Sequence, residues 1–465
     1  MLFWKHPVCH PIQRKILLKN KIFFVSLGCD KNLVDAEHML FSLRKNGYEI
    51  TDEPEEAEVI IINSCCFIAD AMEESINSII ELARYKDEGK LKSLIVTGCL
   101  AERFSDQIKK ELPEVDGIIG TASFDKIIEV VERSLNNEFS NICLPLDRLP
   151  ETEGRLLTTG GHYAYLKIAE GCNKNCSYCI IPKVRGPYRS FPMEDIIKEA
   201  SDLVDNGVRE IILVAQETTL YGTDIYGKKA LPELLRKLSS IKSLAWIRLL
   251  YAYPEEINEE LIDELANNPK ICHYIDMPIQ HCNDNILRRM GRRTNKAELI
   301  QKIKTLRSRI PDICLRTTLI TGFPGETEDE HNEMLDFIKE IRFDRLGAFP
   351  YSKEDGTPAA EFEDQTDDLT KNIRYDNIMR AQQIVAFARN EETVGKELDI
   401  FIEGQLPEDN VYVGRTYKDA PGVDGLVFVT CPYPLMSGDF VTAKVTATKD
   451  YDLLGEVLNE DESTQ

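Results

Sequence analysis

The sequence lacks long apolar runs, and this absence excludes a helix that crosses a membrane. Runs such as Val59 to Ile62 fall far short of the ~18 consecutive residues that a spanning helix needs. The N-terminus also lacks a continuous apolar signal region with a small-residue cleavage site. We therefore expect a cytoplasmic protein without membrane contacts. We also expect it to act as a monomer.

The sequence is also short of positive charge. Its 465 residues include 56 Lys and Arg against 79 Asp and Glu, which gives a net charge of −23. This balance does not suit an enzyme that lies along a phosphate backbone, although a local basic patch would still allow it. A basic protein partner is the more natural expectation.

Cysteine, in contrast, is abundant: thirteen are present in a chain long enough for about three domains. The cytoplasm keeps thiols reduced, so these residues indicate metal ligation or burial rather than a disulfide framework. Six of them occupy positions that favour ligation. Most of the other seven are expected to be small buried hydrophobes; they are Cys9, Cys66, Cys143, Cys272, Cys282, Cys314 and Cys431.

Three of the six lie in one short loop. Residues 171–179 read Gly-Cys-Asn-Lys-Asn-Cys-Ser-Tyr-Cys and follow a strand-like run at 163–168, so Cys172, Cys176 and Cys179 can converge. A structural zinc site needs four ligands, and this loop supplies three. A [4Fe–4S] cluster held by three cysteines keeps one iron open for a small molecule. The spacing therefore favours an iron–sulfur site over a zinc loop or three buried thiols.

The other three cysteines follow predicted strands. Cys29, Cys65 and Cys99 come directly after the first three strand-like runs of the chain. Each alone would more often be a buried thiol. Because ligands bind beyond the carboxyl ends of parallel strands, we expect the three to meet there and hold a second cluster. The alternation that predicts this parallel α/β sheet consists of strands at 22–27, 59–62 and 94–97 and helices at 32–46, 69–85 and 101–112.

The remaining sequence predicts two further domains. Six strand-and-helix repeats between residues 163 and 350 predict a partial (β/α) barrel. Five short strands after Gly395 predict a small β-barrel. The expected division is a leader at 1–21, an N-terminal domain at 22–140, a linker at 141–161, the partial barrel at 162–390 and the β-barrel at 395–460.

Loops after the barrel strands are candidates for cofactor binding. Gln216 follows the second strand and Gly322 follows the fifth. Gly322 has an alternative explanation as a residue that the turn requires. A basic cluster lies beside the cysteine loop; such a run is usually a solvated face, although it would also suit an anionic cofactor or an acidic substrate. Its members are Lys174, Lys183, Arg185 and Arg189.

The spacing of the loop, with Tyr178 before its last cysteine, resembles the signature of radical S-adenosylmethionine (SAM) enzymes. Two sets of three cysteines in this order resemble the methylthiotransferase family, and residues 26–35 are similar to the motif of its RimO branch. The MiaB branch, which modifies transfer RNA, typically begins this motif with Tyr-Gly-Cys-Gln-Met-Asn. Asp30 stands where proline is expected and Cys66 where glycine is expected. Cys65 and Cys66 are therefore both candidates, and the place in the motif favours Cys65.

The resemblance implies a flavodoxin-like N-terminal domain, a partial (β/α)6 radical SAM barrel and a TRAM-like β-barrel. It implies two [4Fe–4S] clusters on the two cysteine sets and SAM near Tyr178, Gln216 and Gly322. The implied reaction adds a methylthio group to the β-carbon of an aspartate in small-subunit ribosomal protein twelve. The same chemistry on a transfer RNA adenosine is the alternative, and a non-catalytic iron–sulfur or zinc scaffold is a third hypothesis. No separate catalytic residue, electron donor or sulfur source is assigned.

The C-terminal region is acidic. Residues 395–465 contain 14 Asp and Glu and 5 Lys and Arg, a net charge of −9. Such a domain repels RNA and attracts a basic protein through interactions that salt screens. We hypothesise that Asp419, Asp424 and Asp439 help to bind the ribosomal protein. The alternative is that these carboxylates only keep a small domain soluble.

Overall fold

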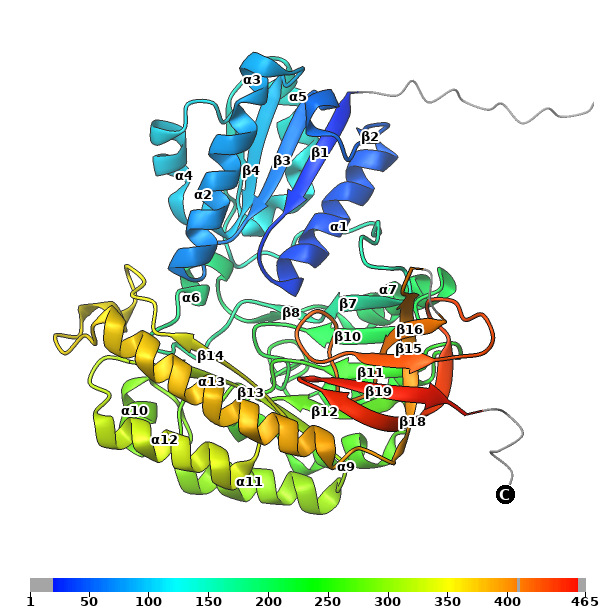
Figure 1. Cartoon of the computed structure of the whole chain (residues 1–465). Helices are drawn as coiled ribbons and strands as arrows, with labels where there is room; N and C mark the ends of the chain where they lie inside the picture. Colours follow the sequence, from blue (N-terminus) through cyan, green and yellow to red (C-terminus); the bar gives the residue numbers. More distant parts are fainter. Residues whose placement is uncertain (1–19, 408–409, 459–465) are drawn as a thin grey trace, which may run out of the picture.

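The computed structural model describes residues 20–407 and 410–458. These residues form an N-terminal sheet domain, a central sheet domain and a closed C-terminal barrel (Figure 1), so the predicted fold class is confirmed. The predicted leader lies outside the described residues except for Asn20 and Lys21, and Lys21 begins the first strand. In the described part of the chain, no helix is long and apolar enough to cross a membrane.

The N-terminal domain is a parallel sheet between two layers of helices. Its strand order is β2-β1-β3-β4-β5-β6, which places the first strand inside the sheet as in doubly wound folds. Strand β3 is buried along its whole length, as expected for an apolar run covered on both faces. The strands are β1 (Lys21–Ser26), β2 (Glu49–Ile50), β3 (Val59–Ser64), β4 (Ser93–Gly98), β5 (Gly117–Ile119) and β6 (Ser140–Ile142).

Two hydrophobic cores hold these layers together. One core joins β3 and β4 to helices α2 and α4, and the other joins the opposite face to α1 and α5. The strand β6 is a correction to the sequence prediction, which placed residues 141–161 in a linker, because residues 140–142 pair with β5 at the edge of the sheet. The helices are α1 (Asp30–Lys45), α2 (Ala69–Ala83), α3 (Tyr85–Glu88), α4 (Cys99–Glu111) and α5 (Ile127–Leu135).

The central domain is a parallel sheet of consecutive strands with helices on its outer face. The order β14-β13-β12-β11-β10-β7 follows the chain, as repeated β/α units require, and the edges β7 and β14 are not paired with each other. This is the expected open (β/α)6 barrel. The strands are β7 (Tyr163–Lys167), β10 (Glu210–Val214), β11 (Trp246–Leu249), β12 (Ile271–Asp276), β13 (Cys314–Thr321) and β14 (Arg345–Pro350).

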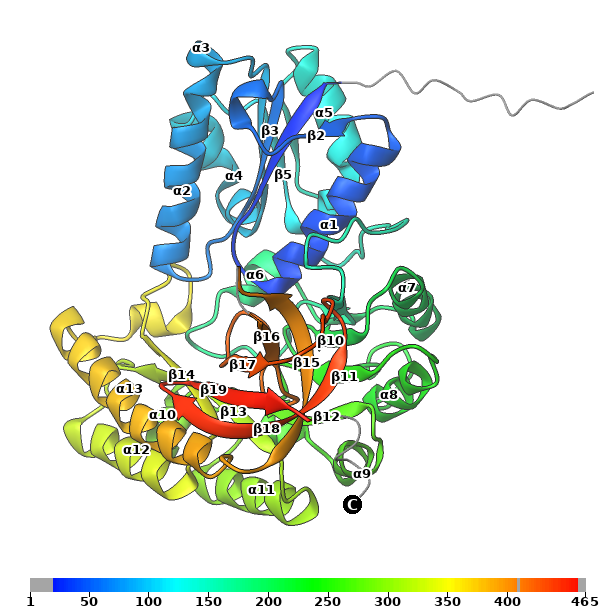
Figure 2. The same cartoon turned by 45° about the vertical axis from the view of Figure 1, so that its right-hand side comes forward.

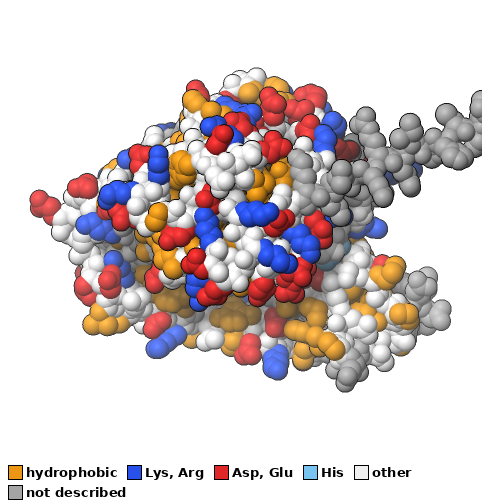
Figure 3. Space-filling model, turned by 90° about the horizontal axis from the view of Figure 1, so that it is seen from above, with side chains coloured by type: hydrophobic (Ala, Val, Ile, Leu, Met, Phe, Trp, Pro, Cys, Tyr) orange, Lys and Arg blue, Asp and Glu red, His pale blue; other side chains and the backbone are white. Residues whose placement is uncertain are grey.

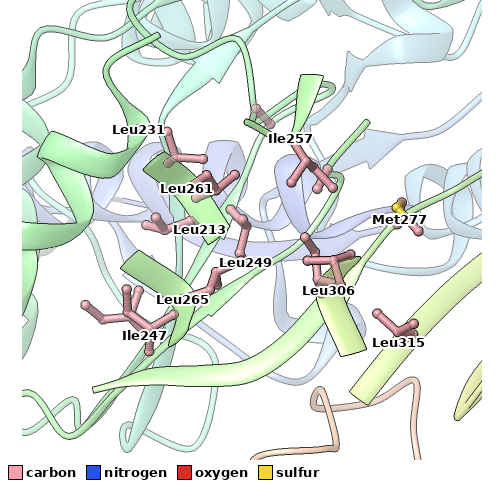
Figure 4. Close-up of a cluster of buried hydrophobic side chains, with 14 of the residues drawn as sticks. Leu213, Leu231, Ile247, Leu249, Ile257, Leu261, Leu265, Met277, Leu306 and Leu315 are labelled. Atoms are coloured by element: carbon pink, nitrogen blue, oxygen red, sulfur yellow. The ribbon is translucent and has the colours of Figure 1, made fainter. Parts of the chain in front are cut away.

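Alternate residues of these strands build the main core. Leu213, Ile247, Leu249 and Leu315 point toward the helices and pack against residues such as Leu261 (Figure 4). The long helix α13 (Asp368–Glu391) leaves the barrel along its outer side (Figure 1). The other helices of this layer are α7 (Met193–Asp205), α8 (Leu231–Ser239), α9 (Glu259–Asn267), α10 (Asp284–Arg289), α11 (Lys296–Arg309) and α12 (Glu328–Ile341).

The C-terminal domain is a closed barrel with strand order β15-β16-β17-β19-β18. Closure leaves no free sheet edge among these strands. The barrel lies against the central sheet in both cartoon views (Figures 1 and 2). Its strands are β15 (Glu397–Gln405), β16 (Val411–Arg415), β17 (Val427–Thr430), β18 (Phe440–Lys449) and β19 (Asp452–Val457).

A segment of the C-terminal barrel fills the concave face of the central sheet. We call residues 415–424, which begin with the last residue of β16, the plug segment. Its Ala420 is buried with Ile212, Val214 and Tyr274, whose side chains point to the face opposite the helix layer. Arg415 donates to Glu210 Oε2 at 2.7 Å within this contact, and both side chains are fully buried. The plug segment therefore covers part of the concave face.

The plug segment overturns part of the hypothesis for the acidic residues. Asp419 is 1% exposed, and its Oδ1 accepts from Arg345 Nη2 at 2.6 Å. Asp424 is paired with Arg316 at 3.5 Å and accepts from the Tyr274 hydroxyl at 2.8 Å. These two carboxylates face the central domain and are not a surface for a basic partner. Asp424 and Asp439 are both partly exposed as residues, but the Asp424 side chain is only 2% exposed, so of the predicted three Asp439 is the candidate left for a surface role.

We predict that Asp419→Asn destabilises the docking of the two domains. Removing one charge of a buried ion pair leaves the other uncompensated, so we expect a loss of about 3 kcal/mol. Thermal unfolding and limited proteolysis of the full chain would measure it. Asp439→Asn is the matched control, because among the described residues the Asp439 carboxylate accepts a single hydrogen bond, from the nearby Met436 N–H. Equal melting of the two variants would contradict the prediction.

Candidate functional site

The three N-terminal cysteines lie together at the lower edge of the N-terminal sheet. Cys29 precedes α1, Cys65 follows β3 and Cys99 is the first residue of α4. This edge faces the central domain (Figure 1). The loops are tightly apposed, because a methyl group added to Gly28 would lie 3.1 Å from Cys65 Sγ. The strand ends thus bring together the set that the sequence predicts.

Two thiols of this set, those of the buried Cys65 and Cys99, are costly to ionise in the absence of a bound group. Burial raises the pKa of Cys65 and of Cys99, and the neighbouring thiols raise both further. A metal centre removes this cost because coordination deprotonates a thiol outright. A set of close, partly desolvated thiols therefore fits an iron–sulfur cluster.

Cys65 fits the set better than Cys66. The Cys65 side chain is 6% exposed and adjoins the loop of Cys29. Cys66 is 1% exposed and packs in the hydrophobic core beside Ile62 and Leu94. Burial raises the pKa of the Cys66 thiol to about 12. The contact with the loop of Cys29 favours Cys65, and the choice between the two cysteines stays a prediction.

The second cysteine set lies in a loop closed by its own strand pair. β8 (Ala169–Glu170) pairs with β9 (Arg189–Ser190), and the loop between them contains all three cysteines and the short helix α6 (Ile181–Arg185). The Cys179 N–H donates to Cys176 O at 3.0 Å. The Lys174 N–H donates to Cys172 Sγ at 3.4 Å. Burial and the neighbouring Cys176 raise the pKa of Cys172 to about 11.

Unpaired polar atoms surround this loop. Most buried polar groups in proteins have a hydrogen-bond partner, so several without one in a single region indicate a polar ligand. Burial also raises the pKa of Glu217 to about 8, and its carboxylate lies 3.9 Å from Lys174 Nζ. The atoms in this region that have no hydrogen-bond partner in the described part of the chain are Tyr188 OH, Gln216 Oε1, Glu217 Oε2, Glu255 Oε2 and Arg292 Nη1. This lining fits a charged small-molecule cofactor.

The three residues predicted to contact the cofactor lie in different surroundings. Gln216 is partly exposed shortly after β10, and its amide oxygen has no hydrogen-bond partner among the described residues. Tyr178 is partly buried near Phe323 and Tyr351. Gly322 has φ +65°, and a Cβ there would lie 2.4 Å from Lys371 Cγ. The turn and the packing of α13 therefore account for this glycine, and its contact with a cofactor stays a prediction.

The basic cluster is not the solvated face that such runs usually form. Arg185 and Lys174 are buried, and Lys174 pairs with Glu255 at 3.3 Å and with Glu256. Lys183 is exposed and donates to the Gly356 carbonyl at 2.6 Å. The two buried cations hold the cysteine loop in place, which charge patterning alone did not reveal.

The sequence analysis missed two residues at this junction. Asn32 donates from its amide to Leu27 O and to Ser64 O, both at 3.1 Å. Tyr251, with φ 58°, follows β11 and donates to Asp30 Oδ1 at 3.2 Å. A non-glycine residue in the left-handed region at a strand end often marks a functional site. For Asn32, its place in the cysteine motif was the available signal.

Most of the remaining cysteines are buried thiols, as predicted. Cys143 is an exception because it is exposed. Cys9 lies outside the described residues. Among the described residues, no three His, Cys, Asp or Glu side chains are grouped to hold a single metal ion. The buried thiols are those of Cys66, Cys272, Cys282, Cys314 and Cys431.

Three family profiles match successive parts of the chain. Residues 21–120 match an uncharacterised protein family designated UPF0004, residues 166–338 match the radical SAM superfamily and residues 394–458 match the TRAM domain. Radical SAM chemistry uses a [4Fe–4S] cluster and SAM, so the central domain is expected to bind both.

Similar proteins align along nearly the whole chain. A protein of Lachnoclostridium phytofermentans named ribosomal protein uS12 methylthiotransferase RimO is 56% identical over 436 residues, covering 94% of this chain and 99% of its own length. The chain belongs to the RimO methylthiotransferase family. A RimO protein of Acetivibrio thermocellus is 49% identical over 95% of this chain and 99% of its own length. The RimO resemblance found in the motif at residues 26–35 is thereby confirmed.

Solved structures share the fold at low identity. The radical SAM methyltransferase TsrM of Kitasatospora setae, with cobalamin and a [4Fe–4S] cluster bound, matches with a TM-score of 0.52 and 13% identity, covering 74% of this chain and 77% of that chain. The cobalamin-dependent radical SAM enzyme OxsB matches with a TM-score of 0.50 and 15% identity, covering 80% of this chain and 56% of that chain. These likenesses extend beyond the central domain, which supports the arrangement of a sheet domain beside a radical SAM domain.

Proposed function

We propose that this RimO-family chain adds a methylthio group to the β-carbon of an aspartate in ribosomal protein uS12. The observation that carries the proposal is the alignment with RimO proteins over nearly the full length of both chains. A ribosomal substrate also places the enzyme in the cytoplasm. The net charge of −23 suits a basic ribosomal protein.

The proposal assigns each cysteine set its own [4Fe–4S] cluster. Cys172, Cys176 and Cys179 would hold the cluster that binds SAM, and Cys29, Cys65 and Cys99 would hold the cluster that supplies sulfur. When bound, these groups supply radical chemistry at an unactivated carbon. The chain's own contribution is to hold the loops close together, to bury them and to offer Gln216, Glu217 and Arg292 as polar contacts.

The charge distribution supports a protein substrate over transfer RNA. Seen from above, Lys and Arg side chains are interspersed with Asp and Glu on the visible face (Figure 3). An RNA-binding domain typically carries a basic stripe with aromatic side chains for stacking. The net charge of the whole chain, rather than that of the barrel alone, disfavours RNA. Asp419 and Asp424 of the C-terminal barrel form ion pairs with arginines of the central domain and are not surface charges.

We expect the reconstituted enzyme to modify uS12 and to leave transfer RNA unmodified. The purified enzyme would be incubated anaerobically with SAM, a reductant and either substrate, and intact-mass analysis would detect one added methylthio group. The uS12 protein from cells with and without the gene gives the same comparison in vivo. Modification of transfer RNA with unmodified uS12 would move the chain to the MiaB type of reaction.

A further inference from the structure

Helix α6 connects the two cysteine sets. It begins two residues after Cys179, within the loop of the central domain. Its Val184 and the preceding Ile180 nevertheless pack in the core of the N-terminal domain, where they lie with Leu94 and Val96. The Thr121 hydroxyl donates to the Val184 carbonyl at 2.6 Å. In Figure 2, α6 lies at the lower end of α1, between the two domains.

Arg185, the last residue of α6, is 2% exposed and completes a buried group of charges. Its Nη1 donates to Asp35 Oδ2 at 2.7 Å and to Glu170 Oε1 at 3.2 Å. Lys167 pairs with the same two carboxylates. The charges of the two cations and the two carboxylates therefore cancel. One of the carboxylates, Asp35, lies on α1 of the N-terminal domain.

The other amino group of Arg185 donates to the amide oxygen of Asn32. Asn32 in turn contacts each of the three N-terminal cysteine loops. Its Nδ2 donates to Leu27 O, two residues before Cys29, and to Ser64 O, one residue before Cys65. Its Oδ1 lies 3.7 Å from Cys99 Sγ. The fully buried amide of Asn32 thus contacts all three loops. It also accepts a hydrogen bond from the guanidinium of Arg185, which follows the second cysteine set.

We propose that Asn32 and Arg185 are positioning residues that fix the two cysteine sets at one separation. The inference rests on the proposed function, in which both sets hold clusters and sulfur passes from one site to a substrate activated at the other. Transfer between two sites requires a fixed approach of the reacting groups, and supporting hydrogen bonds keep such sites rigid. The five-residue helix α6 connects Cys179 to the buried Arg185. Arg185 in turn donates to Asn32.

The test compares Arg185→Met with Lys167→Met in the full chain reconstituted with iron and sulfide. Both substitutions remove one cation from the same carboxylates, but only the first loses the bond to Asn32. For Arg185→Met we expect uS12 methylthiolation to fall by about 10- to 100-fold while cleavage of SAM to 5′-deoxyadenosine continues. Asn32→Ser should show the same uncoupling. In the double variant Asn32→Ser with Arg185→Met, little further loss is expected because the two residues act as one unit.

Electron paramagnetic resonance of the fully reduced protein gives a readout besides activity. Two reduced clusters at a fixed separation broaden each other's signals. This interaction should weaken or become heterogeneous in Arg185→Met and in Asn32→Ser, and it should persist in Lys167→Met. An unchanged interaction in both Arg185→Met and Asn32→Ser would overturn the inference, as would the same change in all three variants.

Iron content separates this result from a failure of the proposed function. If the unsubstituted enzyme contains about eight iron atoms per chain and modifies uS12, the proposed function stands, whatever the variants show. A parent enzyme with one cluster would refute the two-cluster assignment and, with it, the positioning role. Where Arg185→Met does not fold, Asn32→Ser carries the same comparison without removing a buried charge.

Discussion

Alanine at any one of Cys172, Cys176 and Cys179 is expected to abolish the formation of 5′-deoxyadenosine. The three thiols lie in a single loop held by the β8–β9 pair, and no fourth cysteine follows in the loop to replace a lost ligand. A cluster held by two cysteines would lose the iron arrangement that keeps one position open for SAM. We expect loss of cleavage by chromatographic assay, with the iron of the N-terminal set retained.

Cys272→Ala is the matched control for this series. Cys272 is a buried thiol in the same domain, 3% exposed, on strand β12. Its replacement removes one sulfur from the core and should leave cleavage of SAM in place. If all three loop variants still cleaved SAM, the assignment of this loop would be wrong.

Replacing Cys29, Cys65 and Cys99 together should separate the two halves of the reaction. The triple alanine variant should lose about half of its iron and continue to cleave SAM, yet make no methylthiolated uS12. The physical reason is that this set lies in the N-terminal domain, apart from the loop that is assigned to SAM. Iron analysis, SAM cleavage and intact mass of uS12 measure the three quantities.

Cys66→Ala tests the choice between adjacent cysteines. Cys66 packs in the apolar core, so its replacement should lower stability slightly and leave the iron content intact. Unchanged iron in the triple variant would mean that the three residues are ordinary thiols and not cluster ligands. Loss of iron in Cys66→Ala alone would assign the ligand to Cys66.

Much of the fold was predictable because its strands are short apolar runs separated by clear turn signals. The predicted run at 59–62 lies within strand β3, and the predicted helix at 69–85 begins at the same residue as α2. Strand β6 was missed because residues 140–142, Ser-Asn-Ile, contain one apolar side chain. An edge strand of three residues is specified by pairing with its neighbour rather than by its own sequence.

The site was predictable where spacing or strand ends placed a residue, and not where a partner came from another domain. Cys29, Cys65 and Cys99 follow strands, so topology alone brings them together. Arg185 looked like a surface charge because its carboxylate partner Asp35 lies 150 residues earlier in the sequence. The same reason explains Asp419, whose partner Arg345 lies 74 residues earlier. Long-range ion pairs leave no local pattern.

The plug segment also makes the central domain depend on the end of the chain for its folding. Domains generally fold in the order of synthesis, the N-terminal ones first. The six central strands are complete at Pro350, whereas the plug segment begins at residue 415. In the interval, Arg345 has no carboxylate from Asp419, and the concave apolar surface around Ile212 and Val214 meets water. The C-terminal barrel, which is synthesised after the central domain, therefore completes the folding of that domain.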